Sequence, residues 1–435
     1  MLTVIFARVS RSLSRYVALL ALASSLNACA MLPGETETTE APVLESPPQT
    51  VIEEIPPPPA APPVPEPPEF VSFDEAVQKA ADALFAAARL PSLAGRPAAK
   101  HTLVIDPFID GLSAIQSKVT RAAEAKIADI VRVTYTDFLL QPFLAAHVRE
   151  TPLVVIGTLT PVSSDGEPAP RRAGYRFCLA LIDLQSGLIS STAAAYARLD
   201  GVDHSPTAYF RDSPAWMKEP SIDAYVQTCE SGKIGEPVKR AYRESVLVST
   251  LISEAILAYD QGRYREALQL YADAAQLPGG DQLRVYNGLY ITNLKLGRKQ
   301  AAKEAFAKIV EYGFAHKRLA LQFLFKPGTS AFWPDRRISV VYGSWLKEIA
   351  RQFPKEKACL EITGHATPTG SEALNERLSQ SRAEYVKRRL ELEAPALNGR
   401  AIASGAGARE NLIGTGRDDA SDALDRRVTF QIHPC

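Results

Sequence analysis

The 435-residue chain has no excess of either charge, because 49 Lys and Arg residues balance 49 Asp and Glu residues. A protein without a basic excess lacks the long-range attraction that draws a chain to nucleic acid. We therefore expect no nucleic-acid-binding role. The length is sufficient for two or three domains.

The chain also lacks the local motifs of metal sites and of common enzymes. Its five cysteines include no CxxC pair and no Cys/His spacing suited to zinc, and its six histidines form no HExxH or triad-like signature. The stretch GAGAR at 405–409 lacks the third glycine and the following helix of a dinucleotide site, and the acidic string at 414–425 does not have the spacing of an EF-hand loop. We expect no cofactor, no metal and no enzymatic activity.

The apolar run near the amino terminus, YVALLALASSL, is too short to cross a bilayer as a stable helix. Three arginines between residues 8 and 15 precede it, which is the layout of an export signal. The tetrad LNAC at 26–29 resembles the bacterial lipobox. That resemblance implies a signal peptide over 1–28 and a lipid on Cys29, and Ala30 in place of Asp implies the outer membrane, facing the periplasm. A soluble secreted protein with ordinary cleavage is the alternative.

Positive charge is absent for a long stretch, since no Lys or Arg occurs between Arg15 and Lys79. Most of this stretch, 29–69, is dominated by Pro and Glu and cannot bury a core, so we expect a disordered linker. At about 3 Å per residue, roughly 40 such residues can reach on the order of 100 Å from a membrane.

The first folded unit is expected over 70–200, with an α/β composition. A helix, FDEAVQKAADALFAAARL, precedes the strand TLVIDPF, and the strand TPLVVIGTLTPV is followed by a hairpin joined by QSG. The helix opening FDEA, the strand VVIGTLTPV and the turn LIDLQSGLI are similar to the periplasmic domains of penicillin-binding-protein activator lipoproteins and of flagellar and curli assembly lipoproteins. Residues 201–235 are rich in turn residues and are expected to form a connecting segment.

Residues 236–318 have a helical pattern that contains a repeat. Two consecutive stretches carry the same order of a glycine, an alanine and an aromatic residue: Gly262, Ala267 and Tyr271, then Gly297, Ala302 and Phe306. This spacing resembles tetratricopeptide repeats, which implies paired helices that bind a peptide. The alternative is a generic pair of helical hairpins, without the inference of peptide binding.

The carboxy-terminal part, 319–435, has the order strand, helix, strand, helix, strand, strand. The motifs that identify it are GHxxxxG at 364–370, NxxLSxxRAxxV at 375–386, GxG at 405–407 and RRV at 426–428. In this order they closely resemble the OmpA-like peptidoglycan-binding domain. The fold class expected for the chain is therefore α/β multidomain: an α/β domain, a short helical tetratricopeptide-like region and an OmpA-like βαβαββ domain.

The resemblance implies a binding site for the diaminopimelate stem peptide of peptidoglycan at Thr367, Asn375, Arg382 and Arg426. Asn375 and Arg382 lie seven residues apart on one face of a helix, and a guanidinium on a largely apolar face needs an anion. In the family this Asn and Arg hold the diaminopimelate, the Arg taking its carboxylate, and an Asp holds the ammonium. Here Thr367 takes the place of that Asp, so the anion half is kept and the cation half is lost. The alternative is that Arg382 pairs with an acid of its own domain.

Export to an oxidising compartment allows disulfides among the other four cysteines: Cys178, Cys229, Cys359 and Cys435. Cys359 begins one predicted strand and Cys435 ends the last, so antiparallel neighbours would bring the two thiols together. We predict a disulfide between Cys359 and Cys435. Pairing of Cys178 with Cys229 stays open.

These features together predict an outer-membrane lipoprotein that binds peptidoglycan and recruits an unidentified envelope protein, as a scaffold or as an assembly or activator factor. The alternative is an interaction module of an envelope complex whose OmpA-like domain has lost peptidoglycan binding, which the threonine at 367 makes credible.

Overall fold

The computed structural model describes residues 68–90, 100–150, 153–169, 172–326, 328–334, 339–353, 358–414, 416 and 420–435. The predicted signal peptide, Cys29 and all but the end of the predicted linker lie outside these residues. Within the described part of the chain, no helix has the length and apolar character needed to span a bilayer.

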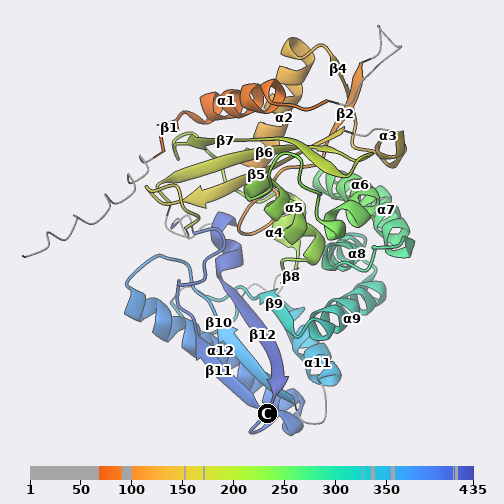
Figure 1. Cartoon of the computed structure of the whole chain (residues 1–435). Helices are drawn as coiled ribbons and strands as arrows, with labels where there is room; N and C mark the ends of the chain where they lie inside the picture. Colours follow the sequence, from red (N-terminus) through yellow and green to blue (C-terminus); the bar gives the residue numbers. More distant parts are fainter. Residues whose placement is uncertain are drawn as a thin grey trace, which may run out of the picture. The chain divides into compact units, whose positions relative to one another are not determined.

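The first sheet has the order β1-β7-β6-β5-β2-β4 (Figure 1). Strand β3 also pairs with β5. Its strands are β1 (Phe70–Val71), β2 (His101–Ile105), β3 (Ile109–Asp110), β4 (Phe138–Gln141), β5 (Leu153–Val162), β6 (Gly174–Asp183) and β7 (Leu188–Ala197). The strands β5, β6 and β7 form an antiparallel meander, whereas β2 runs parallel to both β4 and β5. The α/β character expected for 70–200 agrees with this arrangement.

Both faces of this sheet are covered, because every residue of β5 is buried. Alternate β5 side chains such as Val155 pack under helices α1 (Phe73–Ala86) and α2 (Lys118–Thr134). The intervening side chains, such as Val154 and Ile156, pack against helices on the other face. A short helix, α3 (Ala145–Glu150), precedes β5. Successive side chains of β5 point to opposite faces of the sheet and therefore belong to two different hydrophobic cores.

The connecting segment 201–235 contains short helices and a strand that the turn-rich sequence pattern does not indicate. It contains α4 (Ala208–Asp212), β8 (Ala215–Trp216) and α5 (Pro220–Glu230). Strand β8 pairs with the second sheet, and α5 packs on the first. A two-residue strand is too short to show a period, and the proline that signals a turn occupies the first turn of α5, where its missing N–H costs no hydrogen bond.

Four helices follow: α6 (Arg240–Asp260), α7 (Tyr264–Gln276), α8 (Leu283–Lys295) and α9 (Lys299–Ala315). They form two helical hairpins, with Gly262 and Gly297 at the turns in the left-handed region, at φ values of 74° and 72°. The alanine and aromatic residues of the repeat are buried: Ala267, Tyr271, Ala302 and Phe306. The hairpins agree with the predicted helical pairs, whereas their tetratricopeptide character stays a prediction.

The carboxy-terminal elements are β9 (Arg318–Gln322), α11 (Tyr342–Gln352), β10 (Ala358–Gly364), α12 (Glu372–Glu393), β11 (Ala401–Gly405) and β12 (Arg427–Pro434), with short 3-10 helices η1 (Pro395–Leu397) and η2 (Ala420–Asp425). This is the predicted strand and helix order. The second sheet has the order β11-β10-β12-β9-β8, so the connecting segment adds a fifth strand.

The helical hairpins and the second sheet share one hydrophobic core. Phe306 of α9 stacks on Trp345 of α11, with ring centroids 5.1 Å apart and an interplanar angle of 8°. At residues 318 and 319 the chain changes from helical hairpins to the strands and helices of the second sheet. The two parts on either side of this point do not have separate hydrophobic cores.

Strands β10 and β12 are antiparallel neighbours, with Cys359 opposite His433. The structure joins Cys359 to Cys435 by a disulfide, with the two Cα atoms 4.9 Å apart. Cys178 and Cys229 are buried and are not covalently joined.

Candidate functional site

Helix α12 lies unusually close to the ends of β10 and β11, because both strands end in glycine. A Cβ added to Gly364 would lie 2.1 Å from the backbone oxygen of Ser379, and one added to Gly405 would lie 2.6 Å from the backbone nitrogen of Gln380. Only glycine permits this approach without displacing the helix. The two glycines thus fix where the side chains of α12 meet the edge of the sheet.

Three loops meet at this edge. Strands β9 and β10 are both antiparallel to β12, and β11 is parallel to β10, so the carboxyl ends of β9, β10 and β11 lie on the same side of the sheet. The segments that follow them carry Thr329, Thr367 and Gly407. The directions of the paired strands therefore bring these three loops to one edge of the sheet.

Arg382 lies in this site with little access to solvent, because only 4% of the residue is exposed. Its Cζ lies 4.9 Å from the centroid of the Phe325 ring, and its Nε donates a hydrogen bond of 3.2 Å to the backbone oxygen of Thr329. The ring and the carbonyl hold the guanidinium in one orientation. Arg382 is therefore a positioned cation on α12.

Asn375 lies two turns earlier on α12 and is 5% exposed. The helix begins just before it, where the Ser371 side chain accepts a hydrogen bond of 3.3 Å from the backbone nitrogen of Leu374. Both residues predicted on this helix are thus on its buried side.

Thr367 lies in the loop after β10 and is 5% exposed. Its Oγ1 is 2.9 Å from Oγ1 of Thr369, a hydrogen bond between two hydroxyls. The neighbouring Ala366 donates its backbone N–H to the oxygen of Gly407 over 2.8 Å, and Gly407 donates to Oγ of Ser379 on α12 over 2.9 Å. These bonds tie the loops after β10 and β11 to the helix that carries Asn375 and Arg382.

His365 begins the same loop and is 1% exposed. Burial, with Arg427 and Arg318 nearby, lowers the pKa of His365 to about 3. The imidazole is therefore neutral at physiological pH, and its Nε2 lies 3.0 Å from Oγ1 of Thr429. Its function in the fold is to connect the loop to β12.

Arg426 is in a different place. It lines a groove of about 660 Å³ whose other basic residues are Arg211 and Lys295, and whose apolar lining includes Tyr290 and Trp345. Thr367, Asn375 and Arg382 are not among the described residues that line this groove. Thr367, Asn375 and Arg382 thus lie on or beside α12 at one edge of the second sheet, whereas Arg426 lines this groove.

The sequence analysis did not identify Phe325 and Thr329 as parts of the site. They belong to the stretch LALQFLFKPGTSAF, which continues directly from a strand and shows no polar motif. The one available signal is the pair of phenylalanines at 323 and 325, which places Phe325 on the same face as Phe323 if the strand continues.

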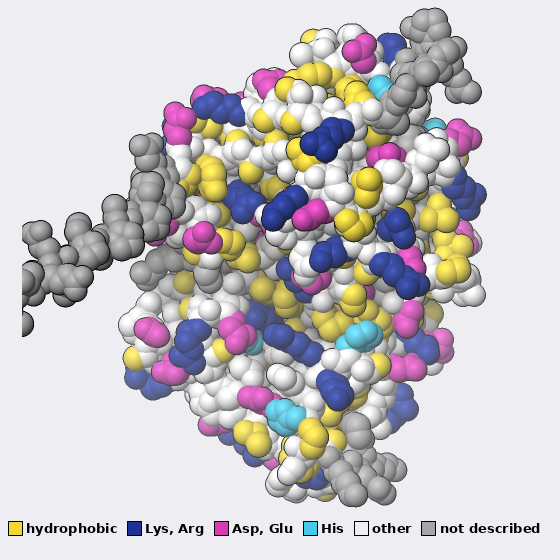
Figure 2. Space-filling view, viewed as in Figure 1, with side chains coloured by type: hydrophobic (Ala, Val, Ile, Leu, Met, Phe, Trp, Pro, Cys, Tyr) yellow, Lys and Arg dark blue, Asp and Glu magenta, His cyan; other side chains and the backbone are white. Residues whose placement is uncertain are grey.

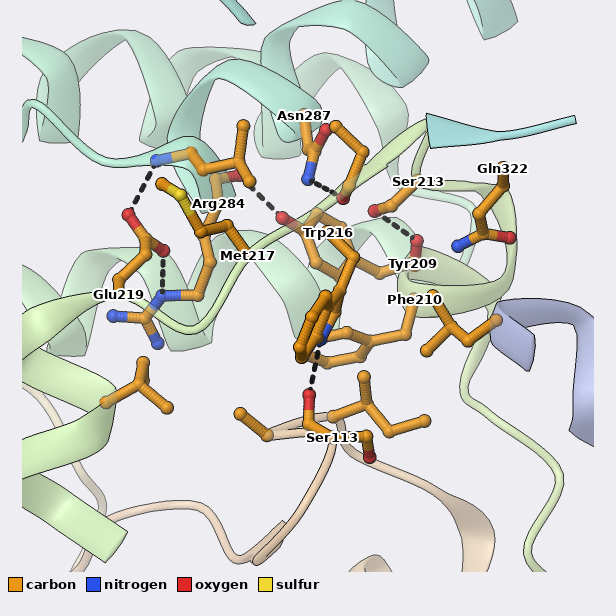
Figure 3. Close-up of a pocket in the computed structure, with 16 residues that line it drawn as sticks. Ser113, Tyr209, Phe210, Ser213, Trp216, Met217, Glu219, Arg284, Asn287 and Gln322 are labelled. Atoms are coloured by element: carbon orange, nitrogen blue, oxygen red, sulfur yellow. Dashed lines mark hydrogen bonds and ion pairs between the residues drawn. The ribbon is translucent and has the colours of Figure 1, made fainter. Parts of the chain in front are cut away.

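A smaller cavity lies where the connecting segment meets the first sheet and the helices (Figure 3). Trp216 donates its Nε1 hydrogen to the backbone oxygen of Ser113 over 2.6 Å, and Asn287 donates Nδ2 to the backbone oxygen of Ala215 over 2.8 Å. Glu219 is buried, its Oε1 accepts from the backbone nitrogen of Leu283 over 2.7 Å, and its Oε2 is 3.5 Å from Nε of Arg284.

The volume of this cavity is about 30 Å³, which leaves room for no more than a few water molecules. We therefore interpret it as a structural junction. On the face shown in Figure 2, basic and acidic side chains lie interspersed, in keeping with the balanced charge of the chain.

Comparison with known proteins gives one family match, to the OmpA family over residues 324–424. A search of curated proteins found no match. The resemblance of 70–200 to activator and assembly lipoproteins, and that of 236–318 to tetratricopeptide repeats, lie outside the family match.

Solved structures similar to part of the chain include three with low identity. The peptidoglycan-associated lipoprotein from Burkholderia pseudomallei is 23% identical, with 26% of this chain and 89% of that chain covered and a TM-score of 0.22. A putative MotB like protein from Desulfovibrio vulgaris is 21% identical, covering 32% and 99% at a TM-score of 0.23. The cell wall anchor of the T6SS from Pseudomonas aeruginosa is 21% identical, covering 30% and 97% at a TM-score of 0.23.

The segment that matches the OmpA family thus includes Phe325, Thr329, Thr367, Asn375 and Arg382, the residues that the structure assembles at one edge of the second sheet.

Proposed function

We propose that this chain is an outer-membrane lipoprotein that binds peptidoglycan through residues 319–435 and recruits an envelope protein partner. The observation that carries the proposal is the orientation of Arg382 within the segment that matches the OmpA family. A guanidinium held between an aromatic ring and a carbonyl is prepared to receive a carboxylate with little loss of side-chain entropy.

The ligand is the diaminopimelate-containing stem peptide. Arg382 takes its carboxylate, Asn375 supplies a neutral hydrogen-bonding group beside it, and Thr367 offers a hydroxyl to its ammonium. Charge-assisted hydrogen bonds contribute about 1.5 to 3 kcal/mol each, so Arg382 dominates and Thr367 contributes less than a carboxylate would. The function is binding, and no covalent bond is broken.

The test is sedimentation of the purified full chain with peptidoglycan, using the parent, Arg382→Ala and Arg388→Ala. Arg388 is a matched control because it is on the same helix, its side chain is 62% exposed and its acidic partner Glu384 is 4.0 Å away. We expect Arg382→Ala to bind at least tenfold more weakly, and Arg388→Ala to bind like the parent. Arg426→Ala, measured in the same series, tells whether the residue in the separate groove also contributes.

A thermal unfolding curve for each variant distinguishes lost binding from lost folding. If Arg382→Ala unfolds like the parent and sediments like the parent, peptidoglycan recognition through this site is wrong. The alternative, an interaction module without peptidoglycan binding, is then preferred.

The groove that contains Arg426 supports the second half of the proposal, the protein partner. Arg211, Lys295 and Arg426 contribute three positive charges to the lining, and Asp212, which pairs with Arg211 and Lys295, contributes one negative charge. The apolar part of the lining includes Trp345 and Tyr290. This combination suits an acidic segment that also carries an apolar side chain. We therefore place the partner contact here.

The partner experiment compares capture from membranes by the parent, Lys295→Glu and Lys308→Glu. Lys308 on α9 is a matched control, since its side chain is 58% exposed and pairs with Glu311 over 2.8 Å. We expect a protein with an acidic segment to be retained by the parent and by Lys308→Glu and to be lost from Lys295→Glu. Equal retention by all three contradicts the groove as the contact.

A further inference from the structure

Two buried cysteines meet between the first sheet and the helix that covers it. Cys178 is on β6 and Cys229 is in the last turn of α5, and they are 2% and 3% exposed. Their Sγ atoms lie 2.6 Å apart. This distance is shorter than the contact of two unbonded sulfur atoms, although it is longer than the roughly 2.0 Å of a disulfide bond.

The elements that carry the two thiols are fixed by contacts on both sides. Cys178 pairs across the strands with Thr158 of β5. Thr158 donates its hydroxyl hydrogen to Oε1 of Glu230 over 2.5 Å, and Glu230 follows Cys229 directly. Thr158 and Cys178 are neighbours across the sheet, and Glu230 and Cys229 are neighbours along the helix. The hydrogen bond between Thr158 and Glu230 therefore places Cys229 over Cys178.

Further contacts hold the same end of α5. Arg176 donates from Nη2 to the backbone oxygen of Glu230 over 2.7 Å, and the same nitrogen is 3.3 Å from Oε2 of Glu230. One turn earlier, the Tyr225 hydroxyl accepts from the backbone nitrogen of Gly157 over 2.9 Å. The thiols are therefore adjacent because the fold places them so, and a bond between them requires no large movement of the backbone.

We propose that Cys178 and Cys229 form a second disulfide, which fastens α5 to the first sheet. The reaction converts two thiols to one S–S bond and releases two protons and two electrons. The electrons reduce a disulfide oxidant, either a protein of the thiol oxidoreductase class or oxidised glutathione, to two thiols. This proposal goes beyond the binding function and does not depend on it.

The bond is expected to form while the chain folds. Burial raises the pKa of the Cys229 thiol well above its ordinary value, and the thiolate is the reactive species. Once the helix covers the sheet, a reagent in solvent reaches neither sulfur readily. A chain that folds with both thiols reduced is therefore oxidised slowly. The disulfide forms during folding, or the two thiols remain reduced for a long time.

The experiment refolds the full chain in a mixture of oxidised and reduced glutathione, so the oxidant is present by design. The product is alkylated in denaturant with N-ethylmaleimide and digested with trypsin without reduction. Cys178 is then in peptide 177–198 and Cys229 in peptide 219–233, whereas Cys359 and Cys435 are in 358–377 and 428–435. Mass spectrometry reads the two pairs separately.

We expect a cross-linked species of 177–198 with 219–233, and at least 90% loss of the two alkylated linear peptides. Recovery of both peptides as N-ethylmaleimide adducts overturns the proposal, whatever the state of the other pair. Linkage of either cysteine to Cys359 or Cys435 in place of its expected partner also overturns it.

A second measurement gives the consequence for stability. In a chain with Cys359→Ser and Cys435→Ser, a phosphine reductant present during refolding and unfolding is expected to lower the unfolding midpoint relative to refolding in the glutathione mixture. A chain that also carries Cys178→Ala and Cys229→Ala is expected to show no effect of reductant. If the reductant does not change the unfolding midpoint of the double serine variant, the Cys178–Cys229 bond does not form. If the double serine variant does not fold, the peptide map of the parent protein decides the question by itself.

Discussion

The burial of His365 predicts how the free energy of unfolding depends on pH. Its imidazole is 1% exposed, and burial lowers its pKa to about 3 from an ordinary value of 6.5. Glu410 lies 3.7 Å from Nδ1, but its side chain is 57% exposed, so solvent weakens its attraction for a proton on the ring. The folded protein therefore binds this proton much more weakly than the unfolded chain does.

The sign and size follow from proton linkage. Between about pH 3 and pH 6.5 the unfolded chain holds a proton on His365 that the folded protein does not, so acidification favours unfolding. The stabilising contribution is complete above the unfolded pKa and is lost as the pH falls below it, at about 1.4 kcal/mol per pH unit. From pH 7 to pH 5 the expected loss is about 2 kcal/mol.

Asp106 changes the free energy of unfolding with pH in the opposite direction to His365. Its effect must therefore be cancelled by the design of the measurement. Burial raises the pKa of this carboxyl to about 7, and its Oδ2 accepts a hydrogen bond of 2.9 Å from the Tyr242 hydroxyl. Its stabilising contribution is complete below its unfolded pKa and is lost as the pH rises through 7. Over pH 5 to 7 this effect is also about 2 kcal/mol, so the parent can show little net dependence.

The assay is therefore a difference between two proteins that share Asp106. Urea unfolding of the parent and of His365→Gln is measured at pH 7, 6 and 5. We expect the parent to lose about 2 kcal/mol relative to the variant between pH 7 and pH 5. A constant difference across the three pH values refutes the reasoning, because it means that His365 takes up a proton equally well in the folded protein.

Three further predictions concern the site, the anchor and the fold. Thr367→Asp is expected to strengthen binding of a soluble diaminopimelate muropeptide about tenfold, since about 1.4 kcal/mol is one decade; unchanged titration curves contradict this. Replacing Cys29 with Ser is expected to move the protein to the soluble periplasmic fraction, and continued membrane retention excludes the lipid anchor. Gly364→Ala is expected to lower the free energy of unfolding by about 1 to 3 kcal/mol, because the new Cβ meets the Ser379 oxygen at 2.1 Å. Gly343→Ala, which has no atom within 4 Å, is the control and should unfold no more easily than the parent in urea.

Local pattern in the sequence was sufficient to predict the order of elements in the carboxy-terminal part. Alternating apolar runs and helical periods predicted strand, helix, strand, helix, strand, strand, and the elements β9, α11, β10, α12, β11 and β12 follow one another along the chain in this order. The sequence motifs also contained Gly364 and Gly405. The structure explains these glycines, because neither position leaves room for a Cβ atom. The buried alanine and aromatic positions of the helical hairpins followed from the same kind of local signal.

Position along the strands also predicted one pair of cysteines. Cys359 is the second residue of β10 and Cys435 follows β12, so antiparallel pairing was enough to suggest that their thiols meet. Cys178 and Cys229 gave no such signal. They meet only because α5 packs across β6, and no periodicity in the sequence states which helix covers which strand.

Other features depended on contacts between distant segments, and only the tertiary structure could decide them. The sequence analysis placed Arg426 and Arg382 in one predicted site, yet the first lines a groove with Lys295 and the second lies over Phe325. β8 joins the second sheet through a two-residue pairing that has no sequence period. The physical reason is common to these cases: burial and pairing are set by the element that packs opposite, and the residues of that element lie far away in the chain.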